Sequence, residues 1–178
     1  MVTEVRPARQ HEVEALHELA AATFPLACPS HLPAVAIAEF IATHLSVAAF
    51  TAHLAEPDHA VLVAEVDGDL RGYALAKLGR PDDPDVLAAV PDGPWCELSK
   101  LYVHPDAHGS GLARALLDAV ESTARDASAV TLWLGVNALN ARANAFYAKQ
   151  GLEVVGPRRF VVGGQVEEDF VRARPVGA

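Results

Sequence analysis

The sequence predicts an α/β fold with a mixed central sheet, and three observations lead to this prediction. Asp67-Gly68 lies between two strand-like apolar runs, which indicates a hairpin of antiparallel strands. An amphipathic helical segment separates the strand-like residues 95–103 from residues 129–136, and a strand-helix-strand order implies a parallel crossover. The length of 178 residues suits one core, so we expect a single domain over residues 1–178.

Hydrophobic periodicity predicts the remaining elements. The other predicted strands are residues 3–7, 60–66 and 70–78, with a last pair that turns at Gly163-Gly164. The predicted helices are residues 13–20, residues 34–55 in two pieces, residues 112–124, and residues 141–150, where Gly151 ends the pattern. Residues 24–33 and 79–94 are predicted to be irregular. The second of these segments holds four prolines and four aspartates, so we expect an exposed, partly ordered loop that is long enough to form one wall of a site.

Composition and charge argue against several classes of protein. An apolar share of 51% with 21% charged residues is ordinary for a globular chain. The 14 basic and 23 acidic residues give a net charge of −9, which repels a phosphate backbone, so we expect no nucleic-acid partner. No apolar run reaches about 18 residues and the N-terminus lacks the layout of a signal peptide. We therefore expect a soluble, cytoplasmic protein without a membrane partner.

Neither the cysteines nor the histidines have the spacing of a metal site. Cys28 and Cys96 are far apart in the sequence and are interpreted as small buried residues. The eight histidines contain no pair with the spacing of a known ligand motif. No metal is predicted.

A glycine-rich turn, His108-Gly-Ser-Gly-Leu-Ala, joins a predicted strand to a predicted helix. The first turn of a helix has backbone N–H groups without partners and a partial positive charge, so diphosphates bind there. Many strand-to-helix turns need a glycine for backbone geometry alone, which is the plain alternative. The lysine of a P-loop and the spacing of a dinucleotide fold are both missing, so the turn indicates a different diphosphate carrier.

Residues 97–151 resemble the GNAT superfamily of acetyl-CoA-dependent N-acyltransferases. The resemblance rests on three linked motifs, which are the strand 97–103, the glycine turn 108–113, and Asn140-Ala-Arg-Ala-Asn-Ala-Phe-Tyr-Ala-Lys-Gln-Gly151. His108 stands where the family usually has Gln or Arg. A weaker resemblance, in residues 132–136 and 160–163, links the chain to bacterial polyamine acetyltransferases, although Asn137-Ala138 stands where many of those proteins have Trp-Glu.

The resemblance implies a three-layer fold in which a mixed, V-splayed sheet of about seven strands is flanked by helices. It implies acetyl-CoA as cosubstrate, held between the strand that ends at Val103 and the strand that ends near Val136. The implied cofactor-binding residues are Leu101, Tyr102, Val103, His108, Gly109, Ser110, Gly111, Leu112, Ala113, Asn140 and Ala143.

Two catalytic residues are implied as well. An alkyl amine with a pKa near 10.4 is protonated at neutral pH, and removing that proton costs roughly 4 to 5 kcal/mol, so a base or a water chain is needed. Glu97 stands where several GNAT enzymes have their general base; the alternative is that it faces solvent or pairs with Lys100 or an arginine. Tyr147 shares a helix face with Asn140 and is implied as the acid beside the departing thiolate. Without the resemblance, Tyr147 would be interpreted as a core aromatic and Asn140 as a helix cap.

These observations predict transfer of an acetyl group from acetyl-CoA to a primary amine of a small molecule, directly and in a ternary complex. The four aspartates between residues 82 and 92 favour a small cation such as a polyamine. An aminoglycoside, an amino acid and a protein N-terminus are alternative acceptors, and a sensor or scaffold that binds acyl-CoA without turnover is the alternative from another class. The sequence is also compatible with a homodimer in which the last strands are exchanged.

Overall fold

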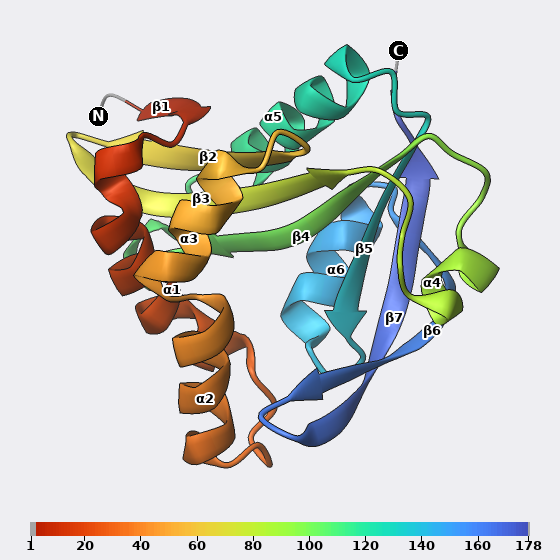
Figure 1. The fold of residues 1–178 in the computed structure, drawn as a ribbon, viewed down its shortest axis with the longest axis horizontal. Helices are drawn as coiled ribbons and strands as arrows, with labels where there is room; N and C mark the ends of the chain where they lie inside the picture. Colours follow the sequence, from red (N-terminus) through yellow and green to blue (C-terminus); the bar gives the residue numbers. More distant parts are fainter. Residues whose placement is uncertain (1–2, 178) are drawn as a thin grey trace.

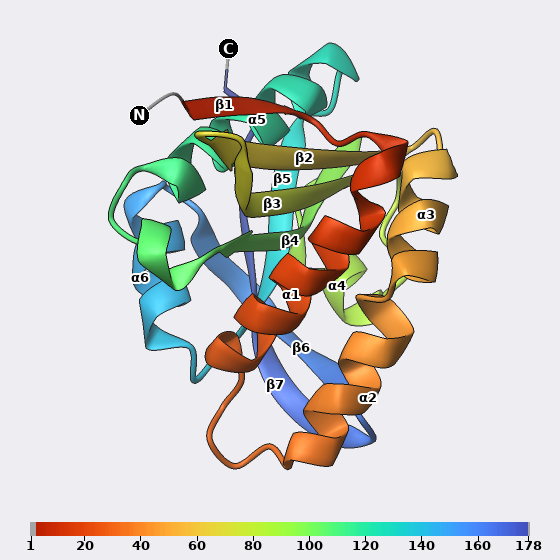
Figure 2. The ribbon, with the colours of Figure 1, turned by 90° about the vertical axis from the view of Figure 1, so that its left-hand side faces the viewer.

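The computed structural model describes residues 3–177, which form a seven-stranded sheet with the strand order β1-β2-β3-β4-β5-β7-β6 and helices on both faces (Figures 1 and 2). The strands are β1 (Thr3–Pro7), β2 (His59–Val66), β3 (Asp69–Leu78), β4 (Trp95–Val103), β5 (Thr131–Asn137), β6 (Glu153–Val162) and β7 (Gln165–Pro175). The helices are α1 (Val13–Ala27), α2 (Ala34–His44), α3 (Val47–Ala55), α4 (Pro84–Ala89), α5 (Leu112–Asp126) and α6 (Ala141–Lys149), with short 3-10 turns at Gln10–Glu12 and Pro105–Ala107.

The sheet is antiparallel except where β4 meets β5. These two strands pair in parallel at only three positions, the last of which joins Glu97 to Trp133. Beyond Glu97 the two strands diverge, so the sheet opens into a V between them (Figure 1). The predicted mixed, splayed sheet, the hairpin at Asp67-Gly68 and the parallel crossover through α5 are all confirmed.

Two large apolar cores hold the layers together, and a third, smaller cluster joins Val86 of α4 to Trp133, Val171 and Ala173. On one face, α5 and α6 pack against the sheet through fully buried side chains such as Leu116 and Leu132. On the other face, α1, α2 and α3 cover β2 to β4, and Phe50 and Tyr73 are fully buried among them (Figure 2). The cavity described below lies where the two halves of the sheet separate, so it is framed by both layers.

Two segments that were predicted to be irregular are partly helical. Helix α1 continues through Pro25 to Ala27, because Phe24 stacks on Phe40 of α2 with 4.5 Å between ring centroids and tertiary packing overrides the weak local propensity. The segment 79–94 contains α4, which Asp83 caps by accepting a hydrogen bond from the backbone N–H of Asp85. The prediction of a loop is therefore wrong for residues 84–89.

The apolar stretch Ala34–Ala55 forms two helices, as predicted. Ser46 separates them, and its side-chain oxygen accepts a hydrogen bond from the N–H of Ala49 at the start of α3. By length and composition alone this stretch is the one candidate for a membrane span within the described residues 3–177.

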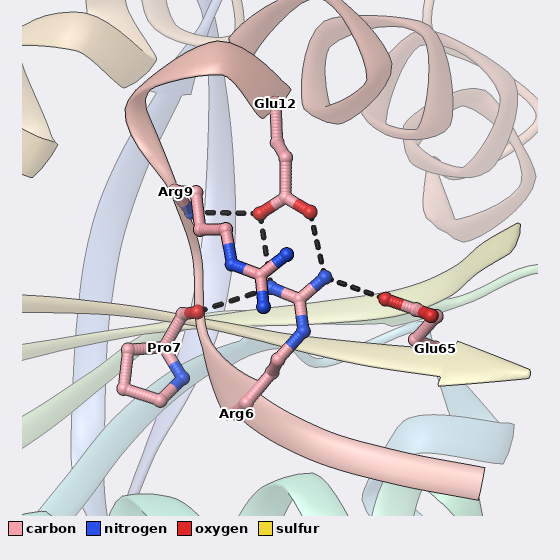
Figure 3. A network of polar contacts seen from close by, with 5 residues as sticks. All are labelled: Arg6, Pro7, Arg9, Glu12 and Glu65. Carbon is pink, nitrogen blue, oxygen red and sulfur yellow. Dashed lines mark hydrogen bonds and ion pairs between the residues drawn. The ribbon is translucent and has the colours of Figure 1, made fainter. Parts of the chain in front are cut away.

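Far from the V, a charged network joins the edge strand β1 to the elements beside it (Figure 3). The Arg6 guanidinium donates hydrogen bonds to both carboxylate oxygens of Glu12, at 2.7 and 3.1 Å, and also contacts Glu65 on β2. Glu12 accepts a further bond from the backbone N–H of Arg9. These bonds, led by that from Arg6, lower the pKa of Glu12 to about 2, so the group is ionised at neutral pH.

Candidate active site

A cavity of about 770 Å³ follows the divergence of β4 from β5. One part of its wall, here called the loop end, comes from β4, the glycine turn and α6; it is formed by Leu101, Val103, Gly109, Gly111, Asn140, Ala143 and Tyr147. The other part, here called the aromatic end, comes from α1, α2, β3, β4 and β6; it is formed by Phe24, Phe40, Lys77, Glu97, Lys100, Arg158 and Phe160. One cavity therefore joins the predicted diphosphate-binding turn to the predicted base.

The glycine turn exposes backbone donors at the start of α5. Gly109 and Gly111 have φ values of +79° and +90°, a region that residues with a Cβ rarely adopt. Within residues 3–177, the N–H groups of Gly109, Gly111, Leu112 and Ala113 have no hydrogen-bond partner. Together with the dipole of a 15-residue helix, these four donors suit an anion.

Two polar side chains of the same turn are occupied within the protein. The His108 ring makes a 2.9 Å hydrogen bond to the carbonyl oxygen of Val103, and the Ser110 hydroxyl donates to the carbonyl oxygen of Ala107 at 2.6 Å. These bonds fasten the turn to the end of β4. The turn therefore presents backbone atoms to the cavity, and its side chains shape the loop.

Strand β4 offers an unpaired backbone edge inside the V. It pairs with β3 along its length, but with β5 only from Trp95 to Glu97. A bulge at Ser99 interrupts the pairing with β3, so that Lys100 lies opposite Leu75. Apart from the carbonyl oxygen of Val103, which the His108 ring binds, the backbone groups of residues 98–103 that face β5 have no strand partner within residues 3–177, so they are open to an extended chain as an additional strand would be.

Helix α6 carries three predicted site residues to the same cavity. Asn140 caps the helix, since its Oδ1 accepts a hydrogen bond from the N–H of Ala143 at 3.1 Å. Tyr147 lies further along the helix and is only 9% exposed. Burial raises the pKa of Tyr147 above its usual value near 10, so the hydroxyl keeps its proton and serves as a hydrogen-bond donor.

Glu97 lies half-buried on β4 at the narrow end of the V and lines the cavity. The register places it beside Lys77 on β3 and beside Trp133 on β5. Within residues 3–177 its carboxylate makes no hydrogen bond or ion pair, either with Lys100 or with an arginine. Its oxygens are available to a ligand.

Sequence reasoning missed most of the aromatic end. Phe24, Phe40 and Phe160 form a wall, with 4.5 Å between the first two ring centroids and 5.9 Å between the last two. Lys100 reaches the same cavity, and burial together with the neighbouring Lys77 lowers its pKa to about 8. Helical spacing in residues 34–44 is the one local signal that could have indicated an aromatic wall, because it gives Phe40 a buried position.

The loop end fits coenzyme A on the structural evidence alone. Free N–H groups at a helix start suit a pyrophosphate, and the open edge of β4 suits the amide-bearing pantetheine arm. No group of three or more His, Cys, Asp or Glu side chains that could hold a metal occurs within the part of the chain that the structure describes.

Comparison with known proteins agrees with the fit of the loop end to coenzyme A. The model of the acetyltransferase (GNAT) family matches residues 13–152, which is most of the chain. The chain belongs to the GNAT family. This GNAT protein is 44% identical to an uncharacterised N-acetyltransferase of Mycobacterium tuberculosis over 163 residues, covering 92% of this chain and 97% of the relative. This GNAT protein is therefore an acetyl-CoA-dependent acyltransferase.

Solved structures share the fold of this GNAT protein. The PaiA N-acetyltransferase of Thermoplasma acidophilum, solved with coenzyme A, superimposes with a TM-score of 0.79 at 20% identity, covering 98% of this chain and 99% of that chain. The ribosomal-protein-S18-alanine N-acetyltransferase of Escherichia coli superimposes with a TM-score of 0.69 at 19% identity, covering 99% and 96% of the two chains. At these identities the likeness concerns the fold.

Proposed function

We propose that this GNAT protein transfers the acetyl group of acetyl-CoA directly to the primary amine of a small molecule, with both substrates bound at once. The observation that carries the proposal is the single cavity whose loop end fits coenzyme A and whose aromatic end holds the unpaired carboxylate of Glu97. Acetyl-CoA supplies the activated acetyl thioester. The chain itself binds, orients and moves protons.

Glu97 accepts the proton that the amine must lose before it can attack. An alkyl ammonium with a pKa near 10.4 resists this loss by roughly 4 to 5 kcal/mol at neutral pH, and a positioned carboxylate lowers the barrier. The amine nitrogen then attacks the carbonyl carbon, while free N–H groups of β4 beyond the Ser99 bulge bind the carbonyl oxygen as it gains negative charge.

Tyr147 stabilises the departing sulfur through a hydrogen bond. A thiol has a pKa near 8.5, well below that of a buried tyrosine, so a complete proton transfer from Tyr147 is unfavourable. A hydrogen bond from the hydroxyl is enough to stabilise the developing thiolate. The proton that completes the thiol comes from elsewhere, for example from the newly protonated base.

The small-molecule acceptor is favoured by the aromatic end, which the side chains of Phe24, Phe40 and Phe160 enclose. A polyamine is a poorer match, because Lys77, Lys100 and Arg158 all line the cavity and would repel a second cationic group. The aspartates at 82 and 83 line only an adjoining pocket, so they do not make the main cavity acidic.

The decisive experiment measures thiol release from acetyl-CoA with a panel of polyamines, aminoglycosides, amino acids and peptides. We expect turnover with one class of amine, and double-reciprocal plots against the two substrates that intersect. Tyr147→Phe should lower kcat about tenfold with little change in KM, because its hydrogen bond strengthens only as the thiolate forms. Tyr73→Phe is the matched control, since Tyr73 lies outside the cavity and its hydroxyl has no partner within residues 3–177.

Parallel plots would contradict direct transfer and indicate an acetylated protein. Tight binding of acetyl-CoA with no thiol release for any amine would overturn the enzymatic proposal and favour a sensor that binds acyl-CoA without turnover.

A further inference from the structure

A second pocket of about 320 Å³ adjoins the aromatic end. Lys77, Glu97 and Arg158 line both cavities, whereas Trp133 lines the second pocket only. We call this second space the side pocket. Glu97 therefore stands at the boundary, with the acetyl-transfer cavity on one side and the side pocket on the other.

Three adjacent strands place three of these groups in one row across the sheet. Glu97 is the register partner of Lys77 on β3 and of Trp133 on β5, so all three side chains lie on the same face. Directly opposed residues on neighbouring antiparallel strands have Cβ atoms about 4.5–5.5 Å apart. A cation and an indole thus flank the carboxylate that takes the amine proton.

The indole of Trp133 has a donor without a partner. Trp133 is 3% exposed, and its Nε1 is buried with no acceptor among residues 3–177. Buried polar atoms are normally hydrogen-bonded, so this N–H, on a residue that lines the side pocket, lacks an acceptor that a ligand in the pocket could supply. Trp95, the other tryptophan, donates its Nε1 hydrogen to the carbonyl oxygen of Pro91 at 2.8 Å.

Arg158 presents a guanidinium to the same space in a fixed orientation. Its Nε and Nη2 donate to Oδ2 of Asp169, at 3.2 and 3.1 Å, and its Cζ lies 5.9 Å from the centroid of the Trp133 ring. The guanidinium occupies the position that a side chain at residue 135 would fill, because a Cβ on Gly135 would come within 2.3 Å of Arg158 Nη2. Its Nη1 has no partner within the described residues.

The other charged groups that line the side pocket are one cation and two carboxylates. Arg80 adds a cation, and Asp82 and Asp83 add two carboxylates, of which Asp83 is engaged in capping α4. Burial, followed by the charge of Lys77, lowers the pKa of His59, so its ring is neutral at pH 7. Asp169 is already paired with Arg158. Lys77 and Arg158 are thus the cations that line the side pocket beside Glu97.

We propose that the acceptor is a small primary amine that also carries a carboxylate, which binds in the side pocket to Lys77, Trp133 Nε1 and Arg158 while the amine faces Glu97. This inference rests on the proposed acetyl transfer and specifies its substrate class. The carboxylate supplies the acceptor atoms that Trp133 and Arg158 lack, and it fixes the amine beside its base. The phenylalanine wall favours an apolar substituent on the same molecule.

Matched pairs of amines with and without the carboxylate test the proposal. Suitable pairs are phenylalanine with phenethylamine, leucine with isoamylamine, and 4-aminobutyrate with propylamine, with spermidine as a polycation. We expect kcat/KM at least tenfold higher for the carboxylate-bearing member of one or more pairs. Trp133→Phe and Lys77→Gln should each raise about tenfold the ratio of KM for that member to KM for its decarboxylated partner, as expected for loss of one charge-assisted hydrogen bond.

Trp95→Phe is the control for Trp133→Phe, because it also removes an indole N–H but lies outside both cavities. It also leaves Trp133 as the only tryptophan. With coenzyme A present, the fluorescence of the Trp95→Phe protein should change as the carboxylate-bearing amine is added, and not with its decarboxylated partner. This measurement needs no turnover.

The outcomes separate the two proposals. Turnover that prefers phenethylamine, isoamylamine, propylamine or spermidine over the carboxylate-bearing amines would overturn the carboxylate proposal and leave acetyl transfer intact. An equal rise in KM for both members of a pair in Trp133→Phe would also overturn the carboxylate proposal and leave acetyl transfer intact. Absence of thiol release with every amine would overturn acetyl transfer itself, and a fluorescence change specific to carboxylates would then show a carboxylate site without catalysis.

Discussion

The loop end and the aromatic end of the cavity recognise their ligands by different means. The loop end presents backbone N–H groups at Gly109, Gly111 and the first residues of α5, together with the open edge of β4. The aromatic end presents side chains from five elements that lie far apart in the sequence. A backbone site depends on local conformation, so one short motif specifies it, whereas a side-chain site depends on how the whole chain folds.

Replacing the proposed proton acceptor at the aromatic end should have the largest effect on activity. Glu97→Gln keeps the shape of the side chain but cannot take a proton, so we expect kcat/KM to fall about 10²- to 10³-fold at neutral pH. The dissociation constant for acetyl-CoA, measured by calorimetry, should stay within twofold. Glu153→Gln, at an exposed position on β6, is the control. An unchanged rate would transfer the role of the base to a water chain or another group.

A substitution at the loop end should weaken cofactor binding and leave KM for the acceptor amine unaffected. Gly111→Ala forces a Cβ into a left-handed conformation, which costs roughly 1 to 2 kcal/mol and distorts the donor array. We expect affinity for coenzyme A to fall about tenfold or more, while KM for the amine at saturating acetyl-CoA is unchanged. Gly68→Ala carries the same strain, with φ of +92°, in a distant hairpin. Equal loss of affinity in both variants would mean that general destabilisation is the cause.

Substitutions in the network of Arg6, Glu12 and Glu65 should change the stability of the protein and leave ligand binding at both ends of the cavity unchanged. Glu12→Gln should lower the free energy of unfolding by roughly 1.5 to 3 kcal/mol at pH 7, since charge-assisted hydrogen bonds are lost. Because the folded-state pKa of Glu12, about 2, is below its unfolded value near 4.5, the contribution is complete above that value and is lost as the pH falls toward 2.

Urea denaturation at pH 7 and at pH 2 to 3 would measure this change. The difference between wild type and Glu12→Gln should shrink on acidification, and both substrate constants should match the wild type. Glu14→Gln, at an exposed position in the first turn of α1, is the control. A difference that persists at pH 2 would show that packing, and not charge, is responsible.

The sequence predicted the strand, turn and helix of the loop end because β4, the glycine turn and α5 are contiguous. The aromatic end was missed for identifiable reasons. Strict alternation along β4 places Glu97 and Lys100 on opposite faces, but the bulge at Ser99 returns Lys100 to the face of Glu97. Pro25 suggested a break in α1, whereas packing of Phe24 keeps the helix intact.

Arg158 illustrates the same limit of local reasoning. Its position in the site depends on the absence of a side chain at Gly135, which is 23 residues away in the sequence, and on its ion pair with Asp169. Neither relation follows from periodicity or from a motif. The element order, the mixed sheet and the hairpin turns were predictable because each follows from residues next to one another in the chain.

The contact between Gly163 and Ala36 has a consequence for how the enzyme could change its substrate. A Cβ on Gly163, in the turn between β6 and β7, would lie 2.3 Å from the Cα of Ala36 on α2, so hairpin and helix touch backbone to backbone (Figure 2). Both segments line the aromatic end of the cavity, and both lie outside residues 95–151, which contain the motifs proposed to bind the cofactor. Larger residues at position 36 or 163 would push α2 and the hairpin apart. The cavity would then have room for bulkier amines without any change in residues 95–151.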